Sequence, residues 1–425
     1  SYYRNLMLSI VRGNFVEGVA PDLFTLHVDD TPSFLEFLTP ITNITDHETG
    51  LPVRDSEILT NYSRDFVDLV VRETTNKDKI YGITNEVDTL QLYYNENLLS
   101  QAGIVNPPVT WSELDLQLND INRQNQNDLE FDKSAISLGT GFSVRNGDLD
   151  LDANINHFYE ILPTLIFQAG GQLYDFQSDT AVFGAGKNQL DLETDNITSE
   201  TFETIEFGAE NPTANALIFY LSFANSAIDR YSWSTESLDI ETRFLLGDLA
   251  YILNYNDFQD TIAEGNRRLD YKVAEIPQLD LDNKKTYGTF FVDVINRQVQ
   301  IAAENAVPGS FDELEKNTKL QKARQFLHYL STLEAQEKIL ANTGRPAARR
   351  DLIERQTQSD LTSRIFAEGS LYADSYYKPD TERVKRLWGD LVYRIQYENQ
   401  TVDESLARAI SEYNIIVGRG PEVRI

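Results

Sequence analysis

Apolar and polar positions along this chain alternate between short strand patterns and helical patterns. Apolar runs predict strands at 23–28, 90–94, 249–255, 272–276 and 289–295. Helical spacing of apolar residues predicts helices at 154–171, 214–227 and 240–246, from 310 onward, and over most of 380–416. Strands that alternate with helices in this way indicate an α/β protein.

Two of the predicted helices begin with a capping box. Thr110 is followed three residues later by Glu113, and Ser310 is followed by Glu313. In this motif the first side chain accepts a hydrogen bond from a free amide at the helix start, and the glutamate reaches back to another. We therefore expect helices to start directly after Thr110 and Ser310.

Composition narrows the possible functions. The chain has 425 residues, with 37 Lys and Arg against 67 Asp and Glu, so its formal charge is −30. A polyanion would be repelled by this charge, which argues against nucleic acid as a partner. The length favours two lobes or domains. The absence of cysteine from the sequence excludes disulfides, thiol nucleophiles and cysteine-ligated metals.

The sequence contains no stretch that would span a membrane. Its longest mainly apolar stretch, 214–224, is interrupted by polar residues and is far shorter than a bilayer crossing requires. The first residues carry no apolar core of a signal peptide. If the protein is exported, we expect the export segment and any membrane anchor to lie ahead of Ser1.

The sequence offers little that points to catalysis or to a cofactor. The four histidines are not spaced as metal ligands, so packing or surface roles are favoured for His27, His47, His157 and His328. The stretch 184–187 lacks the first glycine and the Ser or Thr of a phosphate-binding loop. No cofactor is expected.

Two acidic groups leave alternatives open. Asp148, Asp150 and Asp152 alternate like the first half of a calcium loop, but Ala153 replaces the turn glycine, so a solvated acidic loop over 144–156 is favoured. The pairs Asp29–Asp30 and Glu86–Asp88 could supply the two catalytic carboxylates of a glycosidase. They fit equally well the binding of sugar hydroxyls without cleavage.

Four stretches of the chain, taken together and in this order, resemble the carbohydrate-binding, maltose-binding-protein-like group of extracellular solute-binding proteins of ABC importers. They are Pro21–Ile41, Lys79–Leu114, Phe244–Pro277 and Ala323–Arg349. They include Lys79-Ile80-Tyr81-Gly82-Ile83, Thr110-Trp111-Ser112-Glu113, Gly247-Asp248-Leu249-Ala250 and Thr343-Gly344-Arg345-Pro346. The match extends over most of the chain.

The resemblance implies two α/β lobes joined by crossing strands, with a ligand cleft between them. It places residues 1–94 and 278–344 in the N-terminal lobe, and 95–277 and 345–425 in the C-terminal lobe. It also implies that the first strand and helix of the N-terminal lobe are absent from this chain. The implied function is non-catalytic: a monomer outside the cell or in the periplasm captures a carbohydrate and delivers it to the permease.

The resemblance also implies which residues bind the ligand. Carboxylates from the N-terminal lobe would accept hydrogen bonds from hydroxyls, and rings and an amide from the other lobe would contact the sugar faces. The expected residues are Asp29, Asp30, Glu86, Asp88, Trp233, Tyr255, Asn256, Phe258, Tyr287, Phe290 and Arg345. Three alternatives remain open: the same fold holding a cation such as a polyamine or peptide, a glycoside-acting enzyme, and a surface adhesin or sensor subunit without a transporter.

Overall fold

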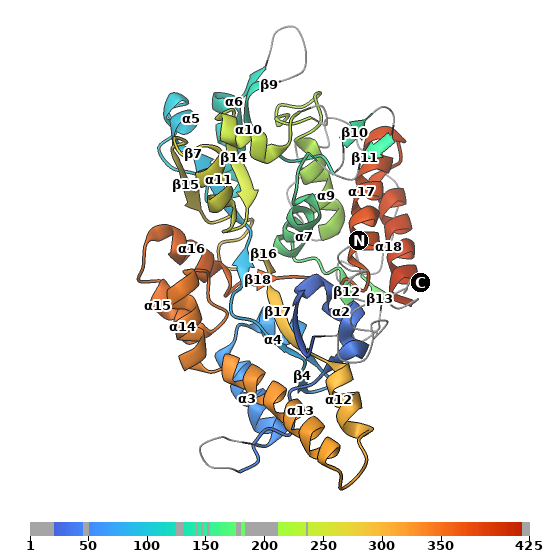
Figure 1. Cartoon of the computed structure of the whole chain (residues 1–425). Coiled ribbons are helices and arrows are strands. Elements are labelled where there is room, and N and C mark those ends of the chain that lie inside the picture. Colours follow the sequence, from blue (N-terminus) through green and yellow to red (C-terminus); the bar gives the residue numbers. More distant parts are fainter. Residues whose placement is uncertain are drawn as a thin grey trace.

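The molecule consists of two lobes stacked along its long axis, with three short strands between them (Figure 1). This computed structural model describes residues 21–45, 51–124, 131–141, 143–145, 148–150, 154–175, 180–182, 211–234 and 237–418. Each lobe has its own cluster of buried apolar side chains. The α/β prediction is therefore confirmed, together with the two-lobed architecture.

The smaller lobe, here lobe 1, is built on a sheet with β17 (Phe291–Asn296) at its centre. β17 pairs antiparallel with β1 (Leu23–His27), β2 (Leu38–Thr39) and β5 (Gly82–Ile83). Around it lie η1 (Val28–Asp30), α2 (Thr31–Phe34), η2 (Leu35–Phe37), α3 (Asp55–Asp65), α4 (Asp68–Thr74), β3 (Thr75–Asn76), β4 (Lys79–Ile80), α12 (Arg297–Glu304), α13 (Phe311–Leu330), α14 (Leu333–Thr343) and α15 (Arg350–Gln356).

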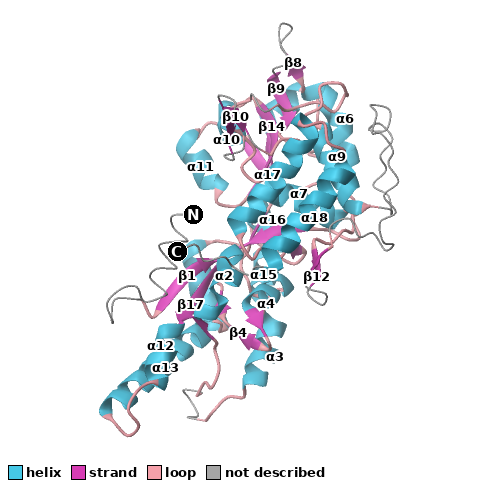
Figure 2. Ribbon diagram, turned by 90° about the vertical axis from the view of Figure 1, so that its right-hand side faces the viewer, coloured by secondary structure: helices cyan, strands magenta, loops and turns pink. Residues whose placement is uncertain are grey.

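The larger lobe, lobe 2, contains a five-stranded sheet. Its order is β15 (Tyr271–Ala274), β7 (Gln91–Asn95), β14 (Leu249–Asn254), β9 (Phe131–Ile136) and β8 (Arg123–Gln124), and only β14–β9 is parallel in this described sheet. Its helices are α5 (Glu96–Gln101), α6 (Trp111–Ile121), α7 (Phe158–Gln168), α9 (Pro212–Ser222), α10 (Ile240–Leu246), α11 (Phe258–Gly265), α17 (Thr381–Tyr397) and α18 (Val402–Gly418). Figure 2 shows α7, α9, α17 and α18 gathered on one side of this lobe.

Two short hairpins complete lobe 2: β10 (Ser143–Arg145) with β11 (Asp148–Asp150), and β12 (Tyr174–Asp175) with β13 (Thr180–Ala181). The first hairpin falls where the sequence favoured an acidic loop, so that expectation is wrong for 148–150. Alternating residues in an acidic segment still form a strand when a partner strand supplies the backbone hydrogen bonds.

The lobes are joined through β6 (Asp88–Thr89), β16 (Thr286–Thr289) and β18 (Ala373–Asp374), in the order β18-β16-β6, with α16 (Leu361–Gly369) beside them. Buried side chains change cluster between Val87 and Leu90, between Tyr287 and Phe290, and between Ile353 and Ile365. In the third crossing Ala367 belongs again to the lobe 1 cluster, and Tyr376 to that of lobe 2. The sequence-based lobe limits place these crossings at 94/95, 277/278 and 344/345. Residues 345–353 pack with lobe 1 in the structure.

In the part of the chain that the structure describes, no helix has the length and apolar character required to cross a membrane.

Candidate functional site

A cleft of about 440 Å³ lies where the two lobes meet. Its wall combines the ends of lobe 1 strands with loops and helix starts of lobe 2. It is lined by His27, Asp29, Asp30, Glu86, Asp88, His157, Tyr159, Glu160, Tyr255, Asp257, Thr289, Phe290, Phe291, Arg345, Thr381, Glu382 and Lys385. Seven of the eleven residues expected from the sequence therefore line this cleft: Asp29, Asp30, Glu86, Asp88, Tyr255, Phe290 and Arg345.

A buried ion pair fixes one edge of the cleft. Asp29 Oδ1 lies 2.6 Å from Lys378 Nζ, and the side chains are 6% and 2% exposed. Burial acts to raise the pKa of Asp29, but Lys378 and the neighbouring His27 outweigh it, so this pKa lies below its ordinary value. The Thr381 hydroxyl also donates to the Asp29 carbonyl at 3.0 Å. The start of α17 in lobe 2 is thus attached to η1 in lobe 1.

Lys378 is also enclosed by aromatic rings. Its Nζ lies 4.8 Å from the Tyr287 ring centroid and 4.7 Å from that of Tyr376. It also donates a hydrogen bond to the Tyr287 hydroxyl. Cation–π contacts of a desolvated ammonium partly replace its lost hydration. Lys378 therefore holds Asp29 from behind the cleft wall.

Asp88 makes a second connection between the lobes. Its Oδ1 accepts hydrogen bonds from the backbone amides of Thr89 at 2.8 Å and of Asn256 at 2.9 Å, and Asn256 belongs to lobe 2. Burial raises the pKa of Asp88 to about 7, although the Asn256 amide favours the charged form. Asp88 can therefore act as an acceptor when ionised and as a donor when protonated near neutral pH.

Glu86 and Arg345 form a looser pair at the cleft surface. Arg345 Nε lies 3.6 Å from Glu86 Oε2. Burial raises the pKa of Glu86, and Arg345 opposes that effect. The guanidinium is about one-third exposed, so it retains donors that a bound molecule can reach.

Lobe 2 contributes a histidine and a tyrosine packed edge to face. His157 lies 4.9 Å from Tyr255, ring centroid to centroid, at 90°. His157 Nδ1 lies 2.9 Å from Glu160 Oε2, and Nε2 lies 3.1 Å from Asn254 Oδ1. Burial acts to lower the pKa of His157, but its hydrogen bond with Glu160 outweighs burial and raises it. Protonation of His157 would place its positive charge directly beside the Glu160 carboxylate.

The aromatic surface of lobe 1 in the cleft comes from Phe291. Phe291 is 53% exposed, whereas the adjacent Phe290 is 2% exposed and belongs to the lobe 1 core. Phe291 packs edge-on against His27 at 5.2 Å, and His27 Nε2 lies 2.9 Å from the Thr289 hydroxyl. The ring is thus held in place while much of it stays open to solvent.

Four expected residues do not line the cleft. Trp233 is 0% exposed, Phe258 2% and Tyr287 0%, and all three belong to the core of lobe 2. Asn256 turns its side-chain oxygen to Gln259 Nε2 at 2.7 Å, and only its backbone amide reaches the site, through Asp88. The resemblance implied that these three rings line the cleft, whereas the structure buries them in the core of lobe 2.

The sequence interpretation missed ten lining residues: His27, His157, Tyr159, Glu160, Asp257, Thr289, Phe291, Thr381, Glu382 and Lys385. His27 and His157 had been considered only as packing or surface residues. His27, Thr289 and Phe291 lie within two residues of expected residues, so nearness in the sequence is the local signal that could have found them. Residues 381–385 approach from a distant helix, and no local pattern reveals that.

Within the described ranges, no group of three or more His, Cys, Asp or Glu side chains is arranged to hold a metal ion. The calcium candidate falls partly on these ranges: Asp148 and Asp150 lie in β11, and Asp152 lies outside the described residues.

Solved structures of the same architecture are similar over nearly the whole chain. An ABC transporter solute-binding protein from Thermotoga lettingae TMO, bound with α-D-tagatose, has a TM-score of 0.61 at 18% identity, covering 98% of this chain and 89% of that one. The cyclic α-maltosyl-1,6-maltose binding protein of Arthrobacter globiformis has a TM-score of 0.64 at 15% sequence identity. That match covers 98% of this chain and 90% of the other. UgpB of Mycobacterium tuberculosis, in complex with glycerophosphocholine, has a TM-score of 0.60 at 14% sequence identity. That match covers 97% of this chain and 87% of the other.

No protein-family model matches the sequence, and no curated protein matches it. The structural likeness concerns the fold, and the ligands of these neighbours differ in chemistry. The chain has the two-lobed fold of the ABC transporter solute-binding proteins.

Proposed function

We propose that this protein captures a saccharide between its two lobes and delivers it to the permease of an ABC importer. The observation that supports this most strongly is the cleft at the junction of the lobes, which combines hydrogen-bonding side chains with exposed aromatic surface in a solute-binding fold. Sugars need both features, because their hydroxyls require polar partners and their C–H faces pack on rings.

The charges of the cleft fit a ligand without strong charge. Seven carboxylates line it, but several are compensated. Asp29 is paired with Lys378 and Glu86 with Arg345, and Glu160 lies beside His157. Burial raises the pKa of Asp88 to about 7. Paired carboxylates still accept hydrogen bonds from hydroxyls, so the cleft offers many acceptors, and nearby cations offset part of their charge.

Delivery requires that the ligand favour one arrangement of the lobes. A ligand shifts this equilibrium only through contacts that it makes in one state and not in the other. Lining residues come from both lobes, for example Phe291 from lobe 1 and Tyr255 from lobe 2. A molecule that touches both would stabilise the closed arrangement, which is the one that we propose docks on the permease.

The proposed role is binding without cleavage, by a monomer located outside the cell or in the periplasm. The solved neighbours are transport proteins rather than enzymes. We propose Asp29, Asp30, Glu86, Asp88, Tyr255 and Arg345 as ligand-facing residues, with Phe291 in place of the buried Phe290.

Thermal unfolding in the presence of single saccharides tests this proposal. Binding at a concentration one hundred times Kd stabilises the folded protein by about 2.7 kcal/mol, which raises Tm. We expect at least one uncharged oligosaccharide to raise Tm and to be recovered intact afterwards. If the stabilising sugar is recovered as hydrolysis products, the protein is an enzyme instead.

A cationic ligand is the second candidate, favoured by the seven carboxylates against Arg345 and Lys385 in the cleft wall. A salt titration separates the two ligand classes, because the Debye length falls to about 3 Å at 1 M salt. The affinity for a polyamine or basic peptide would then fall steeply, whereas the affinity for an uncharged sugar would change little.

A further inference from the structure

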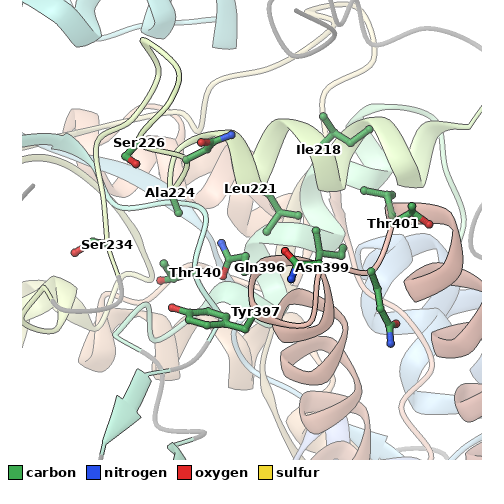
Figure 3. Close-up of a pocket in the computed structure, with 14 residues that line it drawn as sticks. Thr140, Ile218, Leu221, Ala224, Ser226, Ser234, Gln396, Tyr397, Asn399 and Thr401 are labelled. Carbon is green, nitrogen blue, oxygen red and sulfur yellow. The ribbon is translucent and has the colours of Figure 1, made fainter. Parts of the chain in front are cut away.

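A second pocket lies within lobe 2 and shares no lining residue with the interlobe cleft. It has a volume of about 610 Å³ and is formed by α9, the turn after it, the end of α17 and the turn that leads into α18. Figure 3 shows Ile218 and Leu221 reaching into it from α9, with Tyr397 and Gln396 from the end of α17 opposite them.

The described part of the pocket wall is uncharged. None of the fourteen residues that the structure describes around it is acidic or basic, although 24% of the chain's residues are charged. Four aliphatic side chains form part of the wall: Ile218, Leu221, Ile395 and Val402. Hydroxyl and amide side chains form most of the rest: Thr140, Asn225, Ser226, Ser234, Gln396, Asn399, Gln400 and Thr401.

The wall of the pocket is held in position by hydrogen bonds. Gln396 Nε2 donates to the Gly139 carbonyl at 2.7 Å, and the Tyr220 hydroxyl donates to the Thr140 carbonyl at 2.6 Å. Gly139 has a φ of +99°, and a Cβ there would lie 2.6 Å from the Ala224 amide nitrogen. This glycine permits the close approach of the two backbone segments, so the pocket is formed before any ligand arrives, which lowers the entropic cost of binding.

Tyr397 supplies an aromatic platform at the pocket. Its side chain is 45% exposed, and it stacks on Tyr393 with centroids 5.4 Å apart and planes inclined by 11°. The Tyr393 ring thus sets the plane of Tyr397. A solvent-exposed ring held in a fixed plane suits the C–H face of a pyranose, while neighbouring amides and hydroxyls suit its hydroxyl groups.

We propose that this pocket is a second binding site, and that its ligand is an uncharged saccharide. An ion would find no compensating charge in the described wall. A hydrocarbon would leave the hydroxyl and amide groups without hydrogen-bond partners. An uncharged molecule with apolar faces and hydroxyl edges satisfies both parts of the wall. This proposal does not depend on the function of the interlobe cleft.

Hydrogen–deuterium exchange with mass spectrometry measures protection by a ligand at the second pocket and at the interlobe cleft in one experiment. The full chain is incubated with maltotetraose, cellotetraose or mannotetraose, one at a time, at increasing concentration. We expect at least one of them to slow exchange in peptides covering 218–226 and 395–402. Tyr397→Ala should weaken this apparent affinity about tenfold through loss of the stacking surface, and Tyr397→Phe should leave it within about twofold.

Controls separate this site from the cleft. Phe291→Ala alters only the cleft, so we expect it to leave the protection of peptides covering 395–402 unchanged. If the cleft does not bind saccharide, protection will be missing only from peptides around 286–291. The second-site proposal is overturned if no tetrasaccharide slows exchange at 395–402. It is also overturned if Tyr397→Ala has no effect, if Phe291→Ala abolishes the protection, or if an uncharged tripeptide alone produces it.

Discussion

Two adjacent phenylalanines separate ligand binding from stability. Phe291 is 53% exposed in the cleft, whereas Phe290 is 2% exposed in the lobe 1 core. We expect Phe291→Ala to weaken saccharide binding about tenfold and to change the free energy of unfolding by less than about 0.5 kcal/mol. Phe290→Ala should instead lower that free energy by about 3–5 kcal/mol. Calorimetric titration and urea denaturation measure the two effects. Equal effects of both variants on binding would contradict the assignment of Phe291.

Asp88 makes stability depend on pH. Its pKa is about 7 in the folded protein, against an ordinary value of 3.8. Between these pH values the folded state holds a proton that the unfolded state has released, so the free energy of unfolding falls as pH rises from about 4 to about 7. We expect Asp88→Asn to remove this contribution, on the order of 4 kcal/mol across the window. Urea denaturation at several pH values measures it.

The matched control for this prediction is Asp257→Asn, because Asp257 is exposed in the same cleft. That variant should keep most of the wild-type pH dependence. If Asp88→Asn and the wild type lose stability equally between pH 4 and 7, Asp88 is not the group responsible.

At single positions, the sequence located the loops of the cleft better than the side chains within them. It singled out residues 29, 30, 86, 88, 255 and 345, all of which line the cleft. It could not distinguish Phe290 from Phe291, because neighbouring strand residues face opposite sides and only the register decides which is buried. For the same reason it assigned Tyr287, a core residue, to the site.

At the scale of elements, the segment before α17 ties lobe 2 to η1 of lobe 1. Lys378 pairs with Asp29, and both side chains are nearly fully buried. Removing one partner leaves an uncompensated buried charge, so Lys378→Met should lower the free energy of unfolding by about 3–5 kcal/mol. The double variant with Asp29→Asn should recover most of that loss in urea denaturation. A double variant no more stable than the single one would refute the pairing.

The Asp29 side of this contact also has a pH signature. Because the folded pKa of Asp29 is lowered, its contribution is present above the pKa of the unfolded state and is lost as pH falls through the folded pKa. This loss lies on the acid side of the Asp88 window, so the two groups act in different pH ranges.

The sequence predicts a helix start correctly where side chains close to it in the chain determine it. Both capping boxes are confirmed: the Thr110 hydroxyl accepts from the Glu113 amide at 3.2 Å, and the Ser310 hydroxyl from the Glu313 amide at 3.0 Å. Their glutamates reach back to Val109 and Gly309. The β10–β11 hairpin was missed, because pairing between strands depends on a partner segment rather than on apolar periodicity.

For the whole molecule, the order of strands and helices was sufficient to predict two α/β lobes, and the motifs were sufficient to predict the solute-binding fold. The residue pairs that connect the lobes could not be predicted from the sequence, since Asp29–Lys378 and Asp88–Asn256 join positions far apart in the chain. A single sequence contains no signal for such pairs, because no local pattern links two positions that meet only in the fold.

Native mass spectrometry of the protein purified from its source tests the central claim most directly. The account predicts a one-to-one complex whose added mass is that of an uncharged oligosaccharide. It further predicts that this ligand is released intact after prolonged incubation. An added mass equal to a polyamine or a basic peptide, or release of the sugar as cleavage products, would contradict the account.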